Sequence, residues 1–208
     1  EFRRAIALNP GTVTARVWYS LLLDGMGRTD EAVDLARSAA ALDPIYSGFQ
    51  YGRACYLARD YACAEEQLGR VLERGELEIV RGFFGLALAR QGRPAEALRA
   101  LAAAVKTTDA PPRPNHLLNV ATLQAMAGDT TAAWRALRQA REAGAADFWS
   151  ALVFATLGAR DSAFVLLERA DWKWPQHAVR ADPALDALRD DPRFTRLSER
   201  VEREMGLR

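Results

Sequence analysis

The sequence predicts an all-α fold: a right-handed solenoid of helical hairpins, closed at its C-terminal end by capping helices. Three observations predict it. A short turn motif recurs five times along the chain at nearly constant spacing. The residues around each copy repeat in size and polarity with the period of a helix. Hydrophobic residues make up 50% of the chain, which is enough to bury a core along such an array.

The turn motif consists of a tight turn followed by the start of a new helix. Its copies are "GRTDEA" at 27–32, "RDYACA" at 59–64, "GRPAEA" at 92–97, "GDTTAA" at 128–133 and "GARDSA" at 158–163. Every copy ends in alanine, and successive copies lie 30 to 36 residues apart. A period of this length indicates a repeated helix–turn–helix element rather than one globular core.

The helices on both sides of each turn are predicted from the flanking positions. Four and seven residues after the alanine, small or apolar residues recur on the same helical face as the alanine itself. Seven residues before each turn lies a small residue, which lets the two helices approach closely: Ser20, Gly52, Gly85, Ala121 and Ala151. A bulky side chain there would overpack the crossing, at roughly 1–3 kcal/mol.

This pattern resembles the tetratricopeptide repeat family over residues 1 to about 171. The resemblance implies stacked helical hairpins, whose first helices line a concave groove that binds peptides or segments of partner proteins. The tryptophan often found early in the first helix of this family is absent at its usual place, though Trp18 lies nearby. Three further positions depart from the pattern. Arg59 stands where the other turns have glycine, Gln124 where an apolar residue is usual, and Ser150 where a large residue is usual.

The N-terminal end is predicted to begin inside a repeat. Residues 1–12 match the second half of a repeat, with Phe2 and Ala5 at packing positions and Pro10 at its end. A lone second helix would expose its apolar stripe, so we expect residues upstream to cover it. Further along, the proline-rich segment 107–115 is predicted to be a connector, with a binding role for it left open.

The C-terminal end is predicted to be a cap. Residues 172–208 depart from the repeat and resemble the closing segment of many bacterial tetratricopeptide proteins. Asp182 and Asp191 each precede proline, which predicts two helix starts. The predicted organisation is therefore an array over 1–171, made of the partial repeat and about five helix pairs, and a capping tail over 172–208. An apolar stripe of the tail would cover the last repeat: Phe194, Leu197, Val201 and Met205.

Composition excludes several classes of protein. The formal net charge is +1 with acids and bases interspersed, which does not favour direct nucleic-acid binding. No apolar run reaches the ~18–20 residues that span a bilayer. A cytoplasmic location is expected, and a periplasmic one stays open because the true start of the protein is not seen. Two cysteines make no disulfide framework, so Cys55 and Cys63 are expected to be packed or partly exposed thiols.

The sequence favours a protein without catalytic activity. It has no Gly-rich phosphate loop, HExxH, GxSxG or paired CxxC motif. His116 and His177 lack further histidines or cysteines nearby, so no metal site is expected. Asp190 and Asp191 form an acidic pair that helix capping explains. We therefore expect no enzyme activity, cofactor or metal.

The expected function is that of an interaction scaffold for a protein or peptide partner. Projecting the repeat phase onto the first helices gives an aromatic and apolar groove with a few arginines and amides, and such residues are typical anchors of interfaces. Arg53 and Arg90 are expected to meet acidic groups of the partner. The predicted groove residues are Tyr46, Phe49, Arg53, Tyr56, Phe83, Leu86, Arg90, Asn119, Phe148 and Trp149.

Several alternatives stay open. The aromatic residues can instead pack between adjacent repeats, and Trp172 and Trp174 can either anchor a partner or cover the last helix pair. The chain can also be the C-terminal regulatory or sensor region of a larger bacterial signalling protein, behind a kinase, cyclase or DNA-binding effector. A third reading is a structural subunit of a stable assembly, which would use the convex side or the tail.

Overall fold

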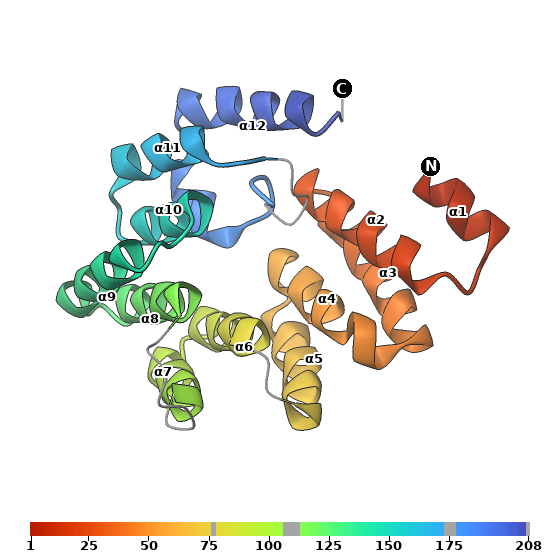
Figure 1. Ribbon diagram of the computed structural model, residues 1–208, viewed down its shortest axis with the longest axis horizontal. Helices are drawn as coiled ribbons and strands as arrows, with labels where there is room; N and C mark the ends of the chain where they lie inside the picture. Colours follow the sequence, from red (N-terminus) through yellow and green to blue (C-terminus); the bar gives the residue numbers. More distant parts are fainter. Residues whose placement is uncertain (76–77, 106–112, 173–177, 207–208) are drawn as a thin grey trace. The chain divides into compact units, whose positions relative to one another are not determined.

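The structure is a computed structural model that describes residues 1–75, 78–105, 113–172 and 178–206, without the side chains of 103–105. These ranges fold into helices joined by short connections, and no strand occurs in them. The predicted all-α class is therefore confirmed. The elements are α1 (Phe2–Leu8), α2 (Val13–Gly25), α3 (Thr29–Leu42), α4 (Pro44–Leu57), α5 (Tyr61–Arg74), α6 (Glu78–Arg90), α7 (Pro94–Val105), α8 (Pro114–Met126), α9 (Thr130–Glu142), α10 (Asp147–Thr156), α11 (Arg160–Arg169), the 3₁₀ helix η1 (Pro183–Leu188) and α12 (Pro192–Glu204) (Figure 1).

Consecutive helices pair as the repeat pattern predicts. Helix α2 packs against α3, α4 against α5, α8 against α9 and α10 against α11. Helices α6 and α7 share a buried apolar cluster with α8, in which Leu88, Leu101 and Leu123 are central. The alanines that end the five turn motifs are all fully buried, which confirms their role at the helix crossings: Ala32, Ala64, Ala97, Ala133 and Ala163.

The hairpin turns share one backbone conformation. Four of the turn residues are glycines with φ between 74° and 84°, at 27, 92, 128 and 158. In α4–α5 the same position is Arg59, with φ 65°. A residue with a Cβ atom loses about 1–2 kcal/mol in this left-handed region, which is why glycine is preferred there. The α4–α5 turn thus has the same backbone conformation as the other turns, but with an arginine in place of the glycine.

The described chain divides into two compact units. The first unit comprises residues 1–83 and 178–182, and the second comprises 84–172 and 183–206. The division falls within α6 and differs from the predicted boundary between array and tail at 171/172, which stays a prediction. In the first unit, α1 packs on α2 through stacked rings of Phe2 and Tyr19, whose centroids are 5.9 Å apart. No residue of α1 is buried.

The C-terminal helix of the second unit forms as predicted. The Asp191 side chain accepts a hydrogen bond from the backbone N–H of Arg193, 2.9 Å away, and so caps α12. Its apolar stripe is buried at Phe194, Leu197 and Val201. Helix α12 lies along α11 (Figure 1), where the Arg193 guanidinium stacks over the ring of Phe164. The other predicted helix start, at Pro183, opens the short 3₁₀ helix η1.

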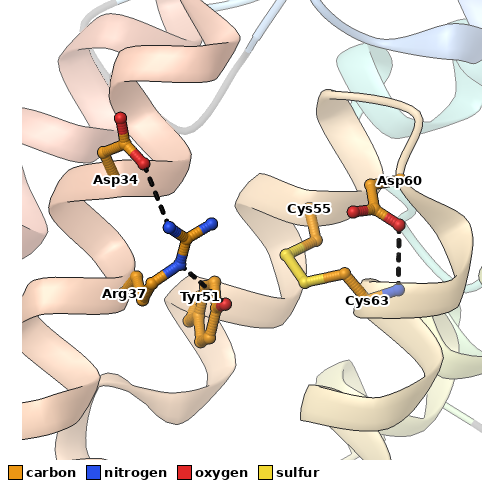
Figure 2. Close-up of a disulfide and its surroundings, with 6 residues drawn as sticks. All are labelled: Asp34, Arg37, Tyr51, Cys55, Asp60 and Cys63. Carbon is orange, nitrogen blue, oxygen red and sulfur yellow. Dashed lines mark hydrogen bonds and ion pairs between the residues drawn. A yellow bond between two sulfur atoms is a disulfide. The ribbon is translucent and has the colours of Figure 1, made fainter.

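The expectation of free thiols is wrong. Cys55 in the last turn of α4 and Cys63 in the first turn of α5 form a disulfide (Figure 2). The bond spans the hairpin turn, and the two Cα atoms are 5.8 Å apart. The two cysteines are eight residues apart in the sequence, and the turn between α4 and α5 brings them to facing positions.

Candidate partner-binding surface

A run of aromatic rings links α4, α5 and α6 in the first unit. Tyr46, Phe49, Arg53 and Tyr56 lie three or four residues apart, which places them on one face of α4. The ring of Phe83 meets the rings of Phe49 and Tyr56 edge-on, at centroid distances of 5.7 and 5.5 Å. The ring of Tyr61 on α5 extends the run, with its centroid 5.7 Å from that of Tyr56. The structure therefore brings together three of the predicted residues from two first helices, namely Phe49, Tyr56 and Phe83.

These predicted residues differ in exposure. Tyr46 is 55% exposed and Phe49 is half-buried, whereas Tyr56 and Phe83 are buried. Ile79, one turn before Phe83 on α6, is 50% exposed. A partner can thus contact Tyr46, Phe49 and Ile79 directly, while the buried ring of Phe83 packs against Phe49.

Arg53 has an acidic partner inside the chain. Its side chain is 4% exposed, and its Nη1 donates to Asp24 Oδ2 of α2 at 2.8 Å. Gln50 also donates to Asp24 Oδ2 and to Ser20 Oγ, at 3.1 and 3.0 Å. Ser20 in turn donates to the backbone carbonyl of Ala32. The predicted meeting of Arg53 with acidic groups of a partner does not fit this burial, because the guanidinium is committed to Asp24.

Asp24 is the centre of this network and is not among the residues predicted from the sequence. Its side chain is fully buried, and its Oδ1 accepts no hydrogen bond from the described residues. Burial raises the pKa of the carboxyl from 3.8 to about 6, against the opposing effects of the Arg53 charge and of hydrogen bonds from Gln50 and Arg53. A signal was available in the sequence: an acid inside the apolar run "LLLDG", one turn after the buried-face position Ser20.

We expect this carboxyl to make the stability of the first unit depend on pH. Because the pKa is higher in the folded chain than in the unfolded chain, folding takes up a proton at pH values between about 4 and 6. The free energy of unfolding therefore rises as the pH falls through this window, by up to about 3 kcal/mol. Urea unfolding between pH 4 and 8 measures this change.

The matched control is Asp24→Asn, which cannot titrate at this position. Subtracting its pH profile from that of the wild type removes the contribution of other carboxyl groups, such as Asp191, whose pKa is lowered to about 2 by hydrogen bonds from Arg193. The difference should fall steadily from pH 4 to pH 6 and then level off. Two parallel profiles would contradict the assignment of a raised pKa to Asp24.

The remaining predicted residues lie in the second unit. Phe148 is buried, with its ring edge-on to Trp149 and Trp172 at 5.0 and 5.7 Å. Trp172 is itself buried, which fits the reading that it covers the last helix pair, while Trp174 lies outside the described residues. The others are half-buried: Leu86, Arg90, Asn119 and Trp149. Binding by any of the predicted residues stays a prediction.

The described residues offer neither a grouped set of metal ligands nor a helix that could span a membrane. Within the described residues, no three His, Cys, Asp or Glu side chains are grouped so that they can hold a metal ion. His116 is buried in α8, and His177 lies outside the described residues. None of the described helices has the length and apolar character needed to cross a membrane.

The arrangement of helices is similar to that of known protein structures. No protein-family model and no curated protein sequence matches the chain. Among solved structures, Cut9 in the APC/C hetero-tetramer Cut9–Hcn1 matches 96% of the chain with a TM-score of 0.63 and 13% identity. PilF of Pseudomonas aeruginosa matches 96% with a TM-score of 0.55 and 17% identity. Both are tetratricopeptide-repeat proteins. This chain has the tetratricopeptide-repeat fold.

The likeness to these two tetratricopeptide-repeat structures concerns the fold, since the identities are low. The chain spans 86% of the PilF chain and 44% of the Cut9 chain. Within the tetratricopeptide-repeat fold, α2, α4, α6, α8 and α10 are the first helices of their hairpins, as the sequence phase predicts. The aromatic run of the first unit therefore belongs to neighbouring first helices, α4 and α6.

Proposed function

We propose that the chain is a non-enzymatic interaction scaffold, and that the first unit binds a segment of a partner protein on α4 and the start of α6. The observation that carries this proposal is the exposure of Tyr46 and Ile79, each one helical turn before a ring of the packed pair Phe49 and Phe83. Aromatic side chains give a large contact area for little lost side-chain entropy. The contact with the buried ring of Phe83 holds the ring of Phe49 in place.

The proposed partner segment is apolar where it meets this surface. Arg53, the cation on the same face of α4, is buried and paired with Asp24, so it offers no free charge to a partner. An extended or helical segment would therefore be recognised by the fit of apolar side chains against Tyr46, Phe49 and Ile79. The fold match to Cut9, which is found in a hetero-tetramer with Hcn1, supports a role in assembly with other proteins.

The second unit offers a separate candidate surface. Trp149, half-buried beside Phe148, is the large aromatic side chain among its predicted residues. Leu86, Arg90 and Asn119 complete this set, and all three are half-buried. We propose this set only as an additional contact region, because its aromatic rings are less exposed than Tyr46.

The double variant Tyr46→Ala/Ile79→Ala tests the proposal. Partners are first identified by affinity purification of the intact protein and mass spectrometry, and the Kd of an identified partner is then measured by titration calorimetry. The variant should weaken binding by about 2 kcal/mol, or roughly thirtyfold in Kd, because anchor residues of an interface are lost. Its melting temperature should stay close to that of the wild type, since both side chains are exposed.

Val165→Ala is the matched control. Val165 is 54% exposed on α11, a second helix of the other unit, so its truncation should leave the Kd unchanged. Unchanged partner binding by a folded Tyr46→Ala/Ile79→Ala variant would show that the surface on α4 and α6 is not the binding site. The same variant with Trp149→Ala added then reports on the second unit.

A further inference from the structure

The hairpin α4–α5 differs from the others at two facing positions. In each hairpin, one residue lies four positions before the turn residue and another lies four positions after it. In α4–α5 both are cysteines, and they are bonded across the turn (Figure 2). The corresponding pairs elsewhere are Leu23 with Glu31, Leu88 with Glu96, Gln124 with Ala132, and Phe154 with Ser162.

The same hairpin carries the unfavourable turn residue. Arg59 adopts φ 65° between α4 and α5, while the equivalent residues of the other hairpins are glycines. Neighbouring turns also have a local ion pair that ties the turn to the second helix, as Arg28 does with Glu31 at 2.6 Å. In α4–α5 the residue that would correspond to Glu31 is Cys63 itself. The disulfide thus coincides with the one described hairpin that lacks the turn glycine.

The two sulfur-bearing residues differ in access. Cys55 is fully buried in the core of the first unit, whereas Cys63 is only half-buried at the start of α5. The backbone N–H of Cys63 donates to the Asp60 carboxylate at 3.0 Å, so this end of α5 is held by a helix cap. Cys63 is therefore the more accessible of the two cysteines to an external thiol.

We propose that the Cys55–Cys63 bond stabilises the α4–α5 hairpin in place of the turn glycine, and that Cys63 is the site where thiol–disulfide exchange forms and opens it. The first unit then reaches its full stability only in oxidising surroundings. Persistent disulfides are found in oxidising compartments, so the bond indicates that this part of the chain works there rather than in a reducing cytosol.

Reduction of the bond by an external dithiol takes two exchange steps. The thiolate of an external dithiol attacks Cys63 Sγ, the bond between the two cysteine sulfurs breaks, and its electron pair leaves on Cys55 Sγ, which takes up a proton. The second thiol of the reagent then displaces Cys63 from the mixed disulfide, leaving two protein thiols and one oxidised reagent. Formation runs in reverse and consumes an external disulfide. Because Cys55 must leave as an anion inside an apolar core, opening should be slow in the folded chain.

The first test counts thiols on the intact chain. Iodoacetamide and intact-mass measurement, before and after dithiothreitol, report both cysteines together because the sequence has no others. After incubation with oxidised glutathione, the folded protein should take up no label. Reduction by dithiothreitol should be slower in buffer than in urea, roughly tenfold or more. Two labelled thiols after oxidation, or equal reduction rates in the two solvents, would overturn the proposal.

The second test measures the melting temperature. Breaking a bond that closes so short a loop should lower it by on the order of 10 °C. Cys63→Ser leaves Cys55 in the core, and it should melt like the reduced wild type and ignore dithiothreitol. Adding Arg59→Gly to Cys63→Ser should recover part of the loss, by several degrees, because glycine tolerates the positive φ.

Ala58→Gly is the matched control for the turn. Ala58, the residue before Arg59, has a φ of −77°, which alanine adopts without strain. Glycine at this position relieves no strain and only adds entropy to the unfolded chain, so Ala58→Gly in the Cys63→Ser background should lower the melting temperature further. Equal melting temperatures of the oxidised and reduced wild type would refute a stabilising role for the bond. A loss of stability in Cys63→Ser/Arg59→Gly relative to Cys63→Ser would refute the proposed link between the bond and the missing glycine.

Discussion

Asp24→Ala is expected to destabilise the first unit by about 3–5 kcal/mol. The substitution leaves the buried Arg53 guanidinium without the Asp24 oxygen that accepts its hydrogen bond, and a buried charged donor that loses its acceptor is among the most costly defects in a protein interior. Gln50 loses an acceptor at the same time. The loss should appear as faster hydrogen exchange in peptides from α2 and α4, measured by mass spectrometry, and as a lower midpoint in urea unfolding.

The double variant Asp24→Leu/Arg53→Met separates charge from packing. It replaces the buried pair by apolar side chains of similar size, a change that is often neutral or stabilising by a few kcal/mol. We therefore expect the double variant to be much more stable than Asp24→Ala. If the two variants lose the same stability, the contribution of Asp24 lies in the hydrogen bond that it accepts from Gln50 or in its volume, and not in its pairing with Arg53.

Gly52→Ala is expected to cost about 2–3 kcal/mol, although alanine is the better helix former. A Cβ atom at position 52 would lie 2.6 Å from Cγ of Leu68 and 3.2 Å from its backbone nitrogen, so α4 and α5 cannot keep their distance. Overpacking of this kind outweighs the gain of about 1 kcal/mol in helix propensity. Urea unfolding measures the difference in the free energy of unfolding.

Gly85→Ala is the matched comparison. Gly85 occupies the same repeat position in α6, but there a Cβ atom would lie 3.2 Å from Cδ1 of Leu123, the end of a side chain. This variant should therefore lose less than Gly52→Ala. In the Leu68→Ala background, the contact with the Leu68 side chain is removed and only the 3.2 Å approach to its backbone nitrogen is left, so most of the added cost should disappear. A cost that persists there would show that the close crossing with Leu68 is not its cause.

Part of the candidate surface could be predicted from the sequence. The residues Tyr46, Phe49 and Tyr56 on one face of α4, and Phe83 on α6, follow from repeat phase and helical periodicity. Their exposure could not be predicted, because it depends on how far neighbouring first helices approach each other. The repeat phase predicts that Tyr46 and Tyr56 both line the groove, yet Tyr46 is exposed and Tyr56 is buried.

The sequence by itself determined the helical hairpins, the buried alanines and the cap at Asp191. These features depend on local spacing and on propensities, which a single chain displays directly. Only the tertiary structure decided that Arg53 pairs with Asp24, that Cys55 meets Cys63, and that the crossing at Gly52 is tighter than the crossing at Gly85. Side chains on different helices meet according to the rotation and spacing of those helices. Since each residue turns a helix by about 100°, a small shift in packing changes every such contact without changing the repeat pattern.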